Sequence, residues 1–386
     1  MTTKQSIISN SSRGGFNKGR RVCVVGGGIG GLTAALAFAR HGADVEVYEQ
    51  AAALTEVGAG IQITPNGARA LKALGLEAAL ADAGLKAQAV EPTDALTGQR
   101  IARFDLGDLD GPAYRFFHRA DLIDVLAGAC RAAGVRINLG VQAQAADLKG
   151  DIIIGADGIR SATRNFLNDD QGWIGTNQVA WRAVVEGVEP DNVARIWMAP
   201  QRHVVTYPLP NGRVNIVAVC ERKEQPEEGW HHEDDPNNLR STFVDCADQV
   251  RSLLDKVETT HLWGLNLHKV AQRWSDGRIC LLGDAAHPTL PFLAQGANLA
   301  VEDAYVMAAV CDRDMDVDVG LERYETLRRP RVIRAIEAAN ANARNYHLSG
   351  VRRRVAHMGL KTLGVVAPKM FLSRMDWLYG HDVTKD

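Results

Sequence analysis

The chain has 386 residues, 46% of them hydrophobic, and a formal net charge of −2. A chain of this length can bury a large core and usually divides into roughly two or three domains. The near-neutral charge creates no field that would attract nucleic acid, so we expect no nucleic-acid partner. No apolar run approaches the roughly 18 residues that a membrane helix requires, so we predict no membrane span.

The cysteines and the amino-terminal residues favour a cytoplasmic protein. None of the six cysteines forms a C-x-x-C pair, so we expect reduced core residues and no zinc or other metal site. They are Cys23, Cys130, Cys220, Cys246, Cys280 and Cys311. Residues 1–19 are polar and lack the apolar segment of a signal peptide. We expect them to be a disordered leader or an artificial extension.

The first strong pattern is a strand, a helix and a second strand within residues 20–50. The apolar run 22–25 predicts a buried parallel strand, residues 32–40 predict a helix of small side chains, and residues 44–48 predict the second strand. This order is typical of the Rossmann-like α/β fold that binds dinucleotides.

The turn after the first strand carries Gly26, Gly28 and Gly31 in the order G-x-G-x-x-G. In the dinucleotide fingerprint these glycines allow a tight turn, admit the pyrophosphate and let the helix pack closely. Glu49 follows about 20 residues later, where a carboxylate can bind ribose hydroxyls. An acid at this place suits FAD or NAD and disfavours a 2′-phosphate. We predict a dinucleotide site, the alternative being a glycine-rich turn in an unrelated α/β protein.

Two segments that follow the fingerprint leave alternatives open. Gly58 and Gly60 lie in a loop and could let the backbone approach a flat ring, although an ordinary loop would look the same. Arg119 stands at the start of a predicted helix and could bind a phosphate. A surface ion pair with Asp121 or Asp124 is the alternative for Arg119.

Two further motifs end apolar strands. Asp157 and Gly158 follow the first of these strands, and Asp157 could accept hydrogen bonds from its own turn. Gly283 and Asp284 follow the second. A proline-stiffened loop, 288–296, then leads into an apolar helix whose N-terminus again offers free N–H groups.

These motifs in this order resemble those of the FAD-dependent aromatic hydroxylases, single-component flavoprotein monooxygenases of the para-hydroxybenzoate hydroxylase class. The chain looks most similar to the salicylate, 3-hydroxybenzoate and 6-hydroxynicotinate hydroxylase branch, over about residues 20–345. The resemblance implies an α/β fold with a Rossmann-like FAD-binding domain, a mixed β-sheet substrate domain and a C-terminal helical region. We expect the FAD domain at 20–171 and 271–320, the substrate sheet at 172–270 and the helical region at 321–386. The last region covers the FAD domain or forms a dimer face, so a monomer and a homodimer both remain open.

The resemblance also implies the residues of the cofactor site. Glu49 would hold the adenosine ribose, Arg119 would lie near the flavin and its phosphates, and Asp284 would contact the ribityl hydroxyls. Asp157 is associated with both FAD and NAD(P)H, and the loop before the apolar helix would face the flavin ring. The implied set is Gly26, Gly28, Gly31, Glu49, Gly60, Arg119, Asp157, Gly158, Gly283, Asp284, Pro291, Gly296, Ala297 and Asn298.

His203 and Tyr207 are the candidate catalytic residues. They are four residues apart in H-V-V-T-Y and therefore share one face of a predicted strand. They match the His-x-x-x-Tyr of the resembling branch, where the pair lines the ring pocket and helps to deprotonate the substrate phenol. A structural pair is the alternative. We assign no role to His231, His232, His261 and His268.

The implied chemistry uses non-covalent FAD, NADH or NADPH as hydride donor, and O2. The reduced flavin would form a C4a-hydroperoxide that attacks an electron-rich ring, and ionising a ring hydroxyl would help. We expect hydroxylation of a small hydroxylated aromatic or heteroaromatic acid. The alternatives are a flavin oxidoreductase without oxygen insertion, resembling prenyl reductases, and a non-catalytic dinucleotide-binding protein. His203 and Tyr207 favour the first function, whereas an apolar pocket without them would favour the second.

Two departures from the branch bear on the substrate and the fold. Phe292 stands in the substrate pocket where branch members often place Gln or His, so a polar contact is lost or replaced. Only residues 141–150 separate two predicted strands where the family usually has a longer β-meander. The identity of the aromatic substrate stays open at this stage.

Overall fold

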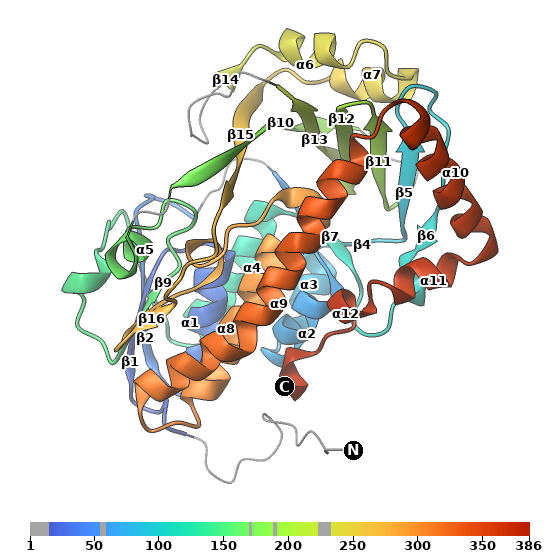
Figure 1. Ribbon diagram of the computed structural model, residues 1–386. Coiled ribbons are helices and arrows are strands. Elements are labelled where there is room, and N and C mark those ends of the chain that lie inside the picture. The colour runs from blue at the N-terminus through green and yellow to red at the C-terminus, as the bar shows by residue number, and fades with distance from the viewer. Residues whose placement is uncertain (1–14, 55–58, 170–171, 188–190, 223–232) are drawn as a thin grey trace.

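The protein is described by a computed structural model with two large β-sheets, one above the other in Figure 1. The lower sheet lies among helices at the left of the view, and the upper sheet is covered by short helices at the top. A long helix, α9 (Val317–Tyr346), runs between the two levels. The described residues are 15–54, 59–169, 172–187, 191–222 and 233–386.

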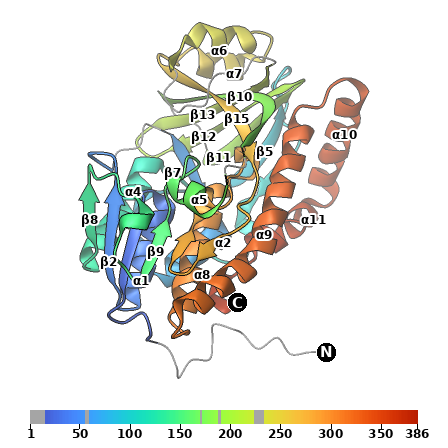
Figure 2. The ribbon, with the colours of Figure 1, turned by 60° about the vertical axis from the view of Figure 1, so that its left-hand side comes forward.

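The six-stranded sheet has the order β16-β17-β9-β1-β2-β8 and is parallel except for β16. Its strands are β1 (Arg21–Val25), β2 (Asp44–Glu49), β8 (Arg136–Leu139), β9 (Ile152–Gly155), β16 (Ser275–Asp276) and β17 (Ile279–Leu281). Helices α1 (Ile29–Arg40), α4 (Arg119–Ala132) and α8 (Gly296–Cys311) accompany it. Strands β9 and β17 are buried throughout, as expected for a parallel sheet with both faces covered. Figure 2 shows β8, β2 and β9 beside α1.

The eight-stranded sheet has the order β14-β15-β10-β13-β12-β11-β5-β6. Its strands are β5 (Ala89–Asp94), β6 (Phe104–Asp105), β10 (Trp173–Glu186), β11 (Val193–Ala199), β12 (Arg202–Leu209), β13 (Arg213–Glu221), β14 (Glu233–Asp234) and β15 (Thr260–His268). All neighbours are antiparallel except β11 and β5, so the sheet is mixed as expected. Helices α6 (Pro236–Thr242) and α7 (Asp248–Leu254) pack on its outer face.

A three-stranded sheet, β3-β7-β4, connects the two levels. It consists of β3 (Gly60–Ile63), β4 (Leu85–Lys86) and β7 (Arg115–His118), with helices α2 (Pro65–Ala73) and α3 (Glu77–Ala83) between them in the chain. The remaining helices are α5 (Ala162–Leu167), α10 (Gly350–Val366), α11 (Pro368–Ser373) and α12 (Asp376–Tyr379). The chain end returns to α9, because Arg331 donates to the carbonyls of Trp377 and Leu378 at 2.9 and 3.0 Å.

Most predicted elements agree with the structure, with small shifts at their ends. Helix α1 begins at Ile29, three residues before the predicted start, because Gly28 is its N-cap and the last fingerprint glycine lies inside the helix. The expected disordered leader is too long, since the amide of Asn17 donates to Asp312 at 3.0 Å and its side chain donates to the Ala308 carbonyl at 2.9 Å. Between β8 and β9 the chain forms only the short 3₁₀ turn η2 (Ala145–Asp147).

All six cysteines are buried and free, which confirms the prediction of core thiols. Within the described residues, no cluster of potential ligands suits a metal ion. No helix in that same part of the chain combines the length and apolarity needed to cross a membrane.

A buried ionic cluster joins α8 to α9. Arg328 pairs with Glu302 at 2.6 Å and with Asp303 at 2.7 Å, and all three side chains are about 1% exposed or less. Arg331 also pairs with Glu302 at 2.7 Å, and His287 Nε2 lies 2.5 Å from Asp303. Burial alone would raise the pKa of Glu302, but the charges of Arg328 and Arg331 lower it to about 2. The cluster fixes the residues before α8.

Replacing Arg328 with Met should destabilise the protein by about 3–5 kcal/mol, because Glu302 and Asp303 would remain buried without their shared cation. In the parent, the depressed pKa of Glu302 stabilises the fold above about pH 4.5, and this contribution is lost as the pH falls toward about 2. In the variant Glu302 keeps only Arg331 and Asp303 keeps only His287. Both carboxyls are then more readily protonated, so the loss of stability in the variant should shrink toward about pH 5.

Urea unfolding at about pH 5 and pH 7.5 measures both effects. Arg273→Met is the matched control, because Arg273 pairs with Asp276 where both side chains are more than half exposed. It should cost about 1 kcal/mol or less. Equal losses in the two variants would show that the buried cluster is not the stronger interaction.

Candidate active site

The fingerprint turn has the geometry that a pyrophosphate needs. Gly26 has φ +108°, and a Cβ there would lie 2.3 Å from the Ala156 carbonyl oxygen. A Cβ on Gly31 would lie 2.0 Å from the Gly26 carbonyl oxygen. A Cβ on Gly28, in contrast, would meet nothing within 4 Å. The two outer glycines are thus required by packing, while the middle one borders open space at the N-terminus of α1, where a phosphate finds free N–H groups.

Glu49 lies beside this turn, at the end of β2. Its carboxylate accepts hydrogen bonds from the amides of Gly27 at 2.7 Å and Ala51 at 2.8 Å. These bonds fix the carboxylate at the edge of the turn, and each oxygen keeps a second lone pair for a further donor.

Asp157 bonds to its own turn, as the sequence suggested. Its carboxylate accepts from the hydroxyl of Ser161 and from the amide and hydroxyl of Thr163, the last two at 3.0 Å. Gly158 follows with φ +75°, a conformation that suits glycine. The turn lies next to the fingerprint, because Ala156 abuts Gly26.

Asp284 and two arginines, Arg119 and Arg182, form a charged group of residues, which we call the charged crevice. Asp284 is exposed, yet protein surrounds it closely enough that desolvation raises the pKa of its carboxyl. Arg119 and Arg182 are among the neighbours whose charges oppose this rise. Burial and the nearby Arg119 lower the pKa of Arg182 to about 10, so Arg182 stays charged at neutral pH. Two cations facing one carboxylate favour an anionic ligand.

The loop before α8 forms one side of this crevice. Gly296 lies close to Asp284, since a Cβ there would be 3.8 Å from its carboxylate. Gly296 and Ala297 begin α8 after Pro291, which opens the 3₁₀ turn η4 (Pro291–Leu293). The side chain of Asn298 is fully buried.

Asn298 has a bracing role in the structure. Its side chain accepts from the Thr64 amide at 2.9 Å and donates to the carbonyls of Gln62 and Ala294 at 3.0 and 2.7 Å. These bonds join the start of α8 to β3. Any contact of Asn298 with the cofactor would therefore come from its backbone.

Gly60 permits close contact between β3 and the large sheet. A Cβ on Gly60 would lie 2.7 Å from both the Tyr207 hydroxyl and the Asn215 side chain. The Gly60 amide donates to Asn215 Oδ1 at 2.6 Å. The close approach shown here is thus to protein side chains rather than to a ring. Gly58 lies outside the described residues.

His203 and Tyr207 lie on the same face of β12, which confirms the strand prediction. Both are buried, and their neighbours come from the α/β level. The ring of Tyr207 lies 5.0 Å from Phe116, whereas the ring of His203 lies 5.5 Å from Phe292. The intervening residue Val204 packs on the opposite side, in the core formed with α6 and α7.

His203 has a histidine partner that sequence reasoning missed. His203 Nδ1 lies 2.7 Å from His347 Nε2, and the His203 ring is also 5.2 Å from the ring of Tyr346 at the end of α9. Burial, followed by the charge of His347, holds the pKa of His203 well below its usual value. His203 is therefore neutral near pH 7. The side chain of Phe292 gives His203 no polar contact, whereas His347 does.

Arg182 is the second functional candidate that the sequence did not single out. Its guanidinium lies 4.5 Å from the centroid of the Trp263 ring, a cation–π arrangement on the inner face of the sheet. W-R at the start of an alternating strand gave no sign that the arginine would be half-buried against an aromatic ring.

Of the other histidines, His231 and His232 lie outside the described residues. His261 is paired with Glu233 across β15 and β14. His268 lies near enough to Asp284 for its charge to oppose the rise in the pKa of that carboxyl.

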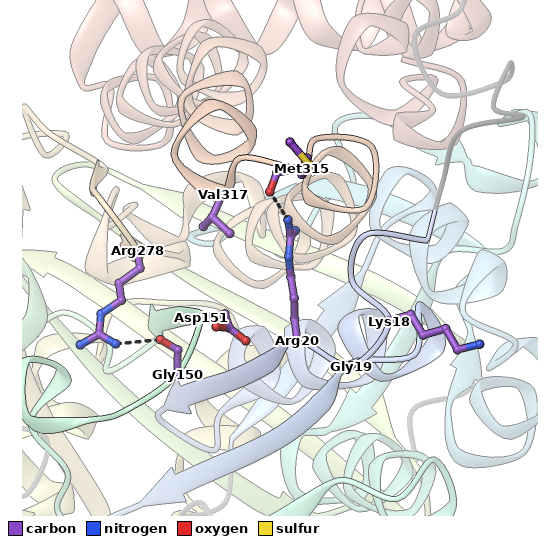
Figure 3. A pocket seen from close by; sticks show the side chains of 8 residues that line it. All are labelled: Lys18, Gly19, Arg20, Gly150, Asp151, Arg278, Met315 and Val317. Atoms are coloured by element: carbon purple, nitrogen blue, oxygen red, sulfur yellow. Dashed lines mark hydrogen bonds between the residues drawn. The ribbon is translucent and has the colours of Figure 1, made fainter.

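The cavity in Figure 3 lies elsewhere and serves no such site. It has a volume of about 530 Å³ and is found at the amino-terminal ends of β1, β9 and β17. Its two arginines are bonded to backbone carbonyls, since Arg20 donates to Met315 at 2.7 Å and Arg278 donates to Gly150 at 2.9 Å (Figure 3). Dinucleotides bind at the opposite, carboxyl ends of such strands.

Comparison with known proteins identifies the family. A model of the FAD binding domain matches residues 20–151 and 141–339. The chain belongs to this FAD-binding family. A 3-amino-4-hydroxybenzoate 2-monooxygenase of Streptomyces platensis is 36% identical over 390 residues, covering 94% of this chain and 96% of the relative. A 3-hydroxybenzoate 6-hydroxylase of Polaromonas naphthalenivorans is 34% identical, with 94% and 96% covered.

A solved structure agrees with this membership. The crystal structure of HpxO from Klebsiella pneumoniae with FAD and uric acid has a TM-score of 0.80 at 25% identity, and 92% of this chain and 95% of that chain are covered. The protein is accordingly an FAD-dependent monooxygenase of the α/β fold that the motifs implied. The family's cofactor fits the residues present: open space over Gly28, the Glu49 carboxylate at the turn, and the cationic crevice beside Asp284.

Replacing Asp284 with Ala should weaken FAD binding by about 1.5–3 kcal/mol, the scale of a hydrogen bond to a charged group. The motivation is its position on the crevice wall beside the start of α8. Flavin-release titration measures the change, and the exposed Asp276→Ala is the control. An unchanged affinity would mean that Asp284 does not contact the ribityl chain.

Proposed function

We propose that the protein hydroxylates a small hydroxylated aromatic or heteroaromatic acid, with His203 as the base that takes the ring hydroxyl's proton. The supporting observation is a buried, neutral histidine on the face of the large sheet that looks toward the charged crevice. A neutral imidazole is a proton acceptor near pH 7. Tyr207 lies farther along the same strand and would orient the substrate.

The substrate class follows from the charge and shape of the surroundings. Leu290 and Phe292 supply apolar walls together with Ala180 and Val219 of the sheet. Arg182 contributes a cation on the same inner face. A flat ring suits the apolar walls, and a carboxylate suits the cation. This combination favours an aromatic acid over the large apolar substrates expected of a prenyl-reductase-like enzyme.

FAD, when bound, accepts hydride and activates O2, and we propose NADH or NADPH as the donor. The chain's own residues bind and orient the cofactor. The α1 N-terminus and Glu49 would hold its pyrophosphate and adenosine ribose, Asp284 the ribityl chain, and Arg119 the neighbouring negative charge. We propose this division of labour: residues 20–171 and 271–320 bind FAD, and residues 172–270 bind the substrate.

A screen of phenolic acids for substrate-stimulated NAD(P)H oxidation tests the proposal. The panel contains salicylate, 3-hydroxybenzoate and 3-amino-4-hydroxybenzoate, with benzoate as the matched acid that lacks a ring hydroxyl. We expect at least one hydroxylated acid to accelerate oxidation and to gain a hydroxyl, and benzoate to gain none. If benzoate stimulated oxidation and gave the same product yield, the reaction would not require a ring hydroxyl on the substrate.

A further inference from the structure

Three titratable side chains form a continuous chain from the buried site to the surface. His203 Nδ1 lies 2.7 Å from His347 Nε2, and His347 Nδ1 lies 3.0 Å from Glu221 Oε1. The exposed fraction rises along the chain, from 1% for His203 to 6% for His347 and 40% for the Glu221 side chain. The residues come from β12, from the C-cap of α9 and from the end of β13.

Glu221 determines the direction of both hydrogen bonds. An ionised carboxylate only accepts, so His347 Nδ1 must carry the proton and donate it. Neutral His347 then has a lone pair on Nε2, which accepts from His203 Nδ1. His203 in turn keeps its lone pair on Nε2, the nitrogen at the far side of its ring. The chain therefore holds His203 in the tautomer that can accept a proton.

Glu221 also has access to solvent. It lines an open pocket of about 350 Å³ at the surface, together with Gln201, Arg202 and Arg222. Arg202 pairs with Asp245. The uncharged Gln178 of β10 also lies beside His347, with its Nε2 3.4 Å from Nδ1. The contact of Nδ1 with the Glu221 carboxylate is shorter, at 3.0 Å, and charge-assisted, so it decides which nitrogen of His347 carries the proton.

We propose that His347 and Glu221 form a proton relay that carries the substrate's phenolic proton from His203 to solvent. The inference rests on the proposed function, in which His203 takes that proton. The O–H bond of the ring hydroxyl breaks, and its proton binds His203 Nε2. The Nδ1 proton of His203 moves to His347 Nε2, and the Nδ1 proton of His347 moves to Glu221, which exchanges with water. Reverse transfer reprotonates the product oxygen and restores both tautomers.

The relay explains how so deeply buried a base can work. A histidine with a strongly depressed pKa holds a proton poorly, so it needs an acceptor in contact to pass the proton on. Phe292 offers no polar atom to His203 from its side chain, and the Tyr346 hydroxyl lies near the Phe292 carbonyl instead. His347 and Glu221 act through His203 and touch no substrate themselves.

Phenol ionisation in the oxidised holoenzyme tests the relay without turnover. The probe is 3-hydroxy-4-nitrobenzoate, whose phenolate absorbs visible light. After a rapid rise in pH, the bound probe should ionise about 10²-fold more slowly in His347→Gln than in the parent. Glu221→Gln should slow it in the same direction, and Glu221→Asp should restore most of the rate. Imidazole should accelerate His347→Ala.

The matched control is His357→Gln. His357 lies on α10, and its Nδ1 is 3.5 Å from the Asp94 carboxylate. The variant should ionise the probe at the parent rate. If the parent ionises the probe and His347→Gln does so equally fast, the relay is wrong while the role of His203 stands. If the parent binds the probe without ionising it, both the base and the relay are wrong.

A second readout needs no ligand. In ¹⁵N spectra of the histidine rings, the relay requires that His203 and His347 both carry their proton on Nδ1 in the holoenzyme. Glu221→Gln should shift the tautomer population of His347 and leave His357 unchanged. A neutral His347 protonated on Nε2 in the parent would overturn the relay, whether or not the nitrobenzoate binds.

Discussion

Replacing Gly28 with Val should abolish FAD binding and leave the fold intact. The separation is sharp because a Cβ at Gly28 meets no protein atom within 4 Å, so the isopropyl group would occupy only the space that the pyrophosphate requires. Gly28 has φ −75°, which any residue adopts, and the backbone should not be strained. The purified variant should be colourless and should unfold in urea like the apo-protein.

Gly128→Val is the control, since Gly128 is exposed in α4 and a Cβ there also meets nothing within 4 Å. It should retain full FAD occupancy. Gly31→Ala should behave differently from both, because its Cβ would overlap the Gly26 carbonyl oxygen and disrupt the turn itself. Full FAD occupancy in Gly28→Val would show that the glycine fingerprint is not the pyrophosphate site.

Replacing His203 with Gln, or Tyr207 with Phe, should lower hydroxylation by about 10²-fold or more, the usual share of acid–base catalysis. FAD binding should persist, and hydride transfer should stay within a few-fold. The lost turnover should appear as H2O2. Phe at position 207 keeps the ring contact with Phe116 at 5.0 Å, so packing is little changed. The quantity to measure is product formed per NAD(P)H consumed.

Tyr324→Phe separates catalysis from stability. Its hydroxyl is buried and donates to the Leu281 carbonyl at 3.1 Å. Within the part of the chain that the structure describes, Tyr324 shares no hydrogen bond or ring contact with His203 or Tyr207. This variant should lose stability without changing the coupling ratio. If the His203 and Tyr207 variants remain as tightly coupled as the parent, the pair is structural and another group must polarise the ring.

The sequence predicts well those parts of the fold that depend on the pattern of neighbouring residues in the chain. The strand, glycine turn and helix at 20–50 depend on residues within one short segment, and only the start of α1 shifted by more than one residue. The two later turns, at Asp157 and Gly283, likewise follow apolar strands that are recognisable by themselves.

The missed features depend on contacts between distant residues. His203 and His347 are 144 positions apart, and their bond requires that α9 end beside β12. Strand β5 pairs in parallel with β11, about a hundred residues later. Residues 89–105 therefore join the eight-stranded sheet, although β4 and β7 on either side of them in the chain belong to the three-stranded sheet. Arg182 looked like any residue of an alternating strand, and the Trp263 ring that it contacts lies on a separate strand, β15. No local pattern encodes such neighbours.

Incorporation of oxygen from ¹⁸O2 tests the central claim most directly. The purified holoenzyme is supplied with NAD(P)H and the hydroxylated acid that best stimulates its oxidation, and the product is analysed by mass spectrometry. We predict a product that carries one ¹⁸O atom and forms in near-equal amount to the NAD(P)H consumed. Oxidation of NAD(P)H that yields only H2O2, or a reduced product without ¹⁸O, with every acid tested would contradict the account.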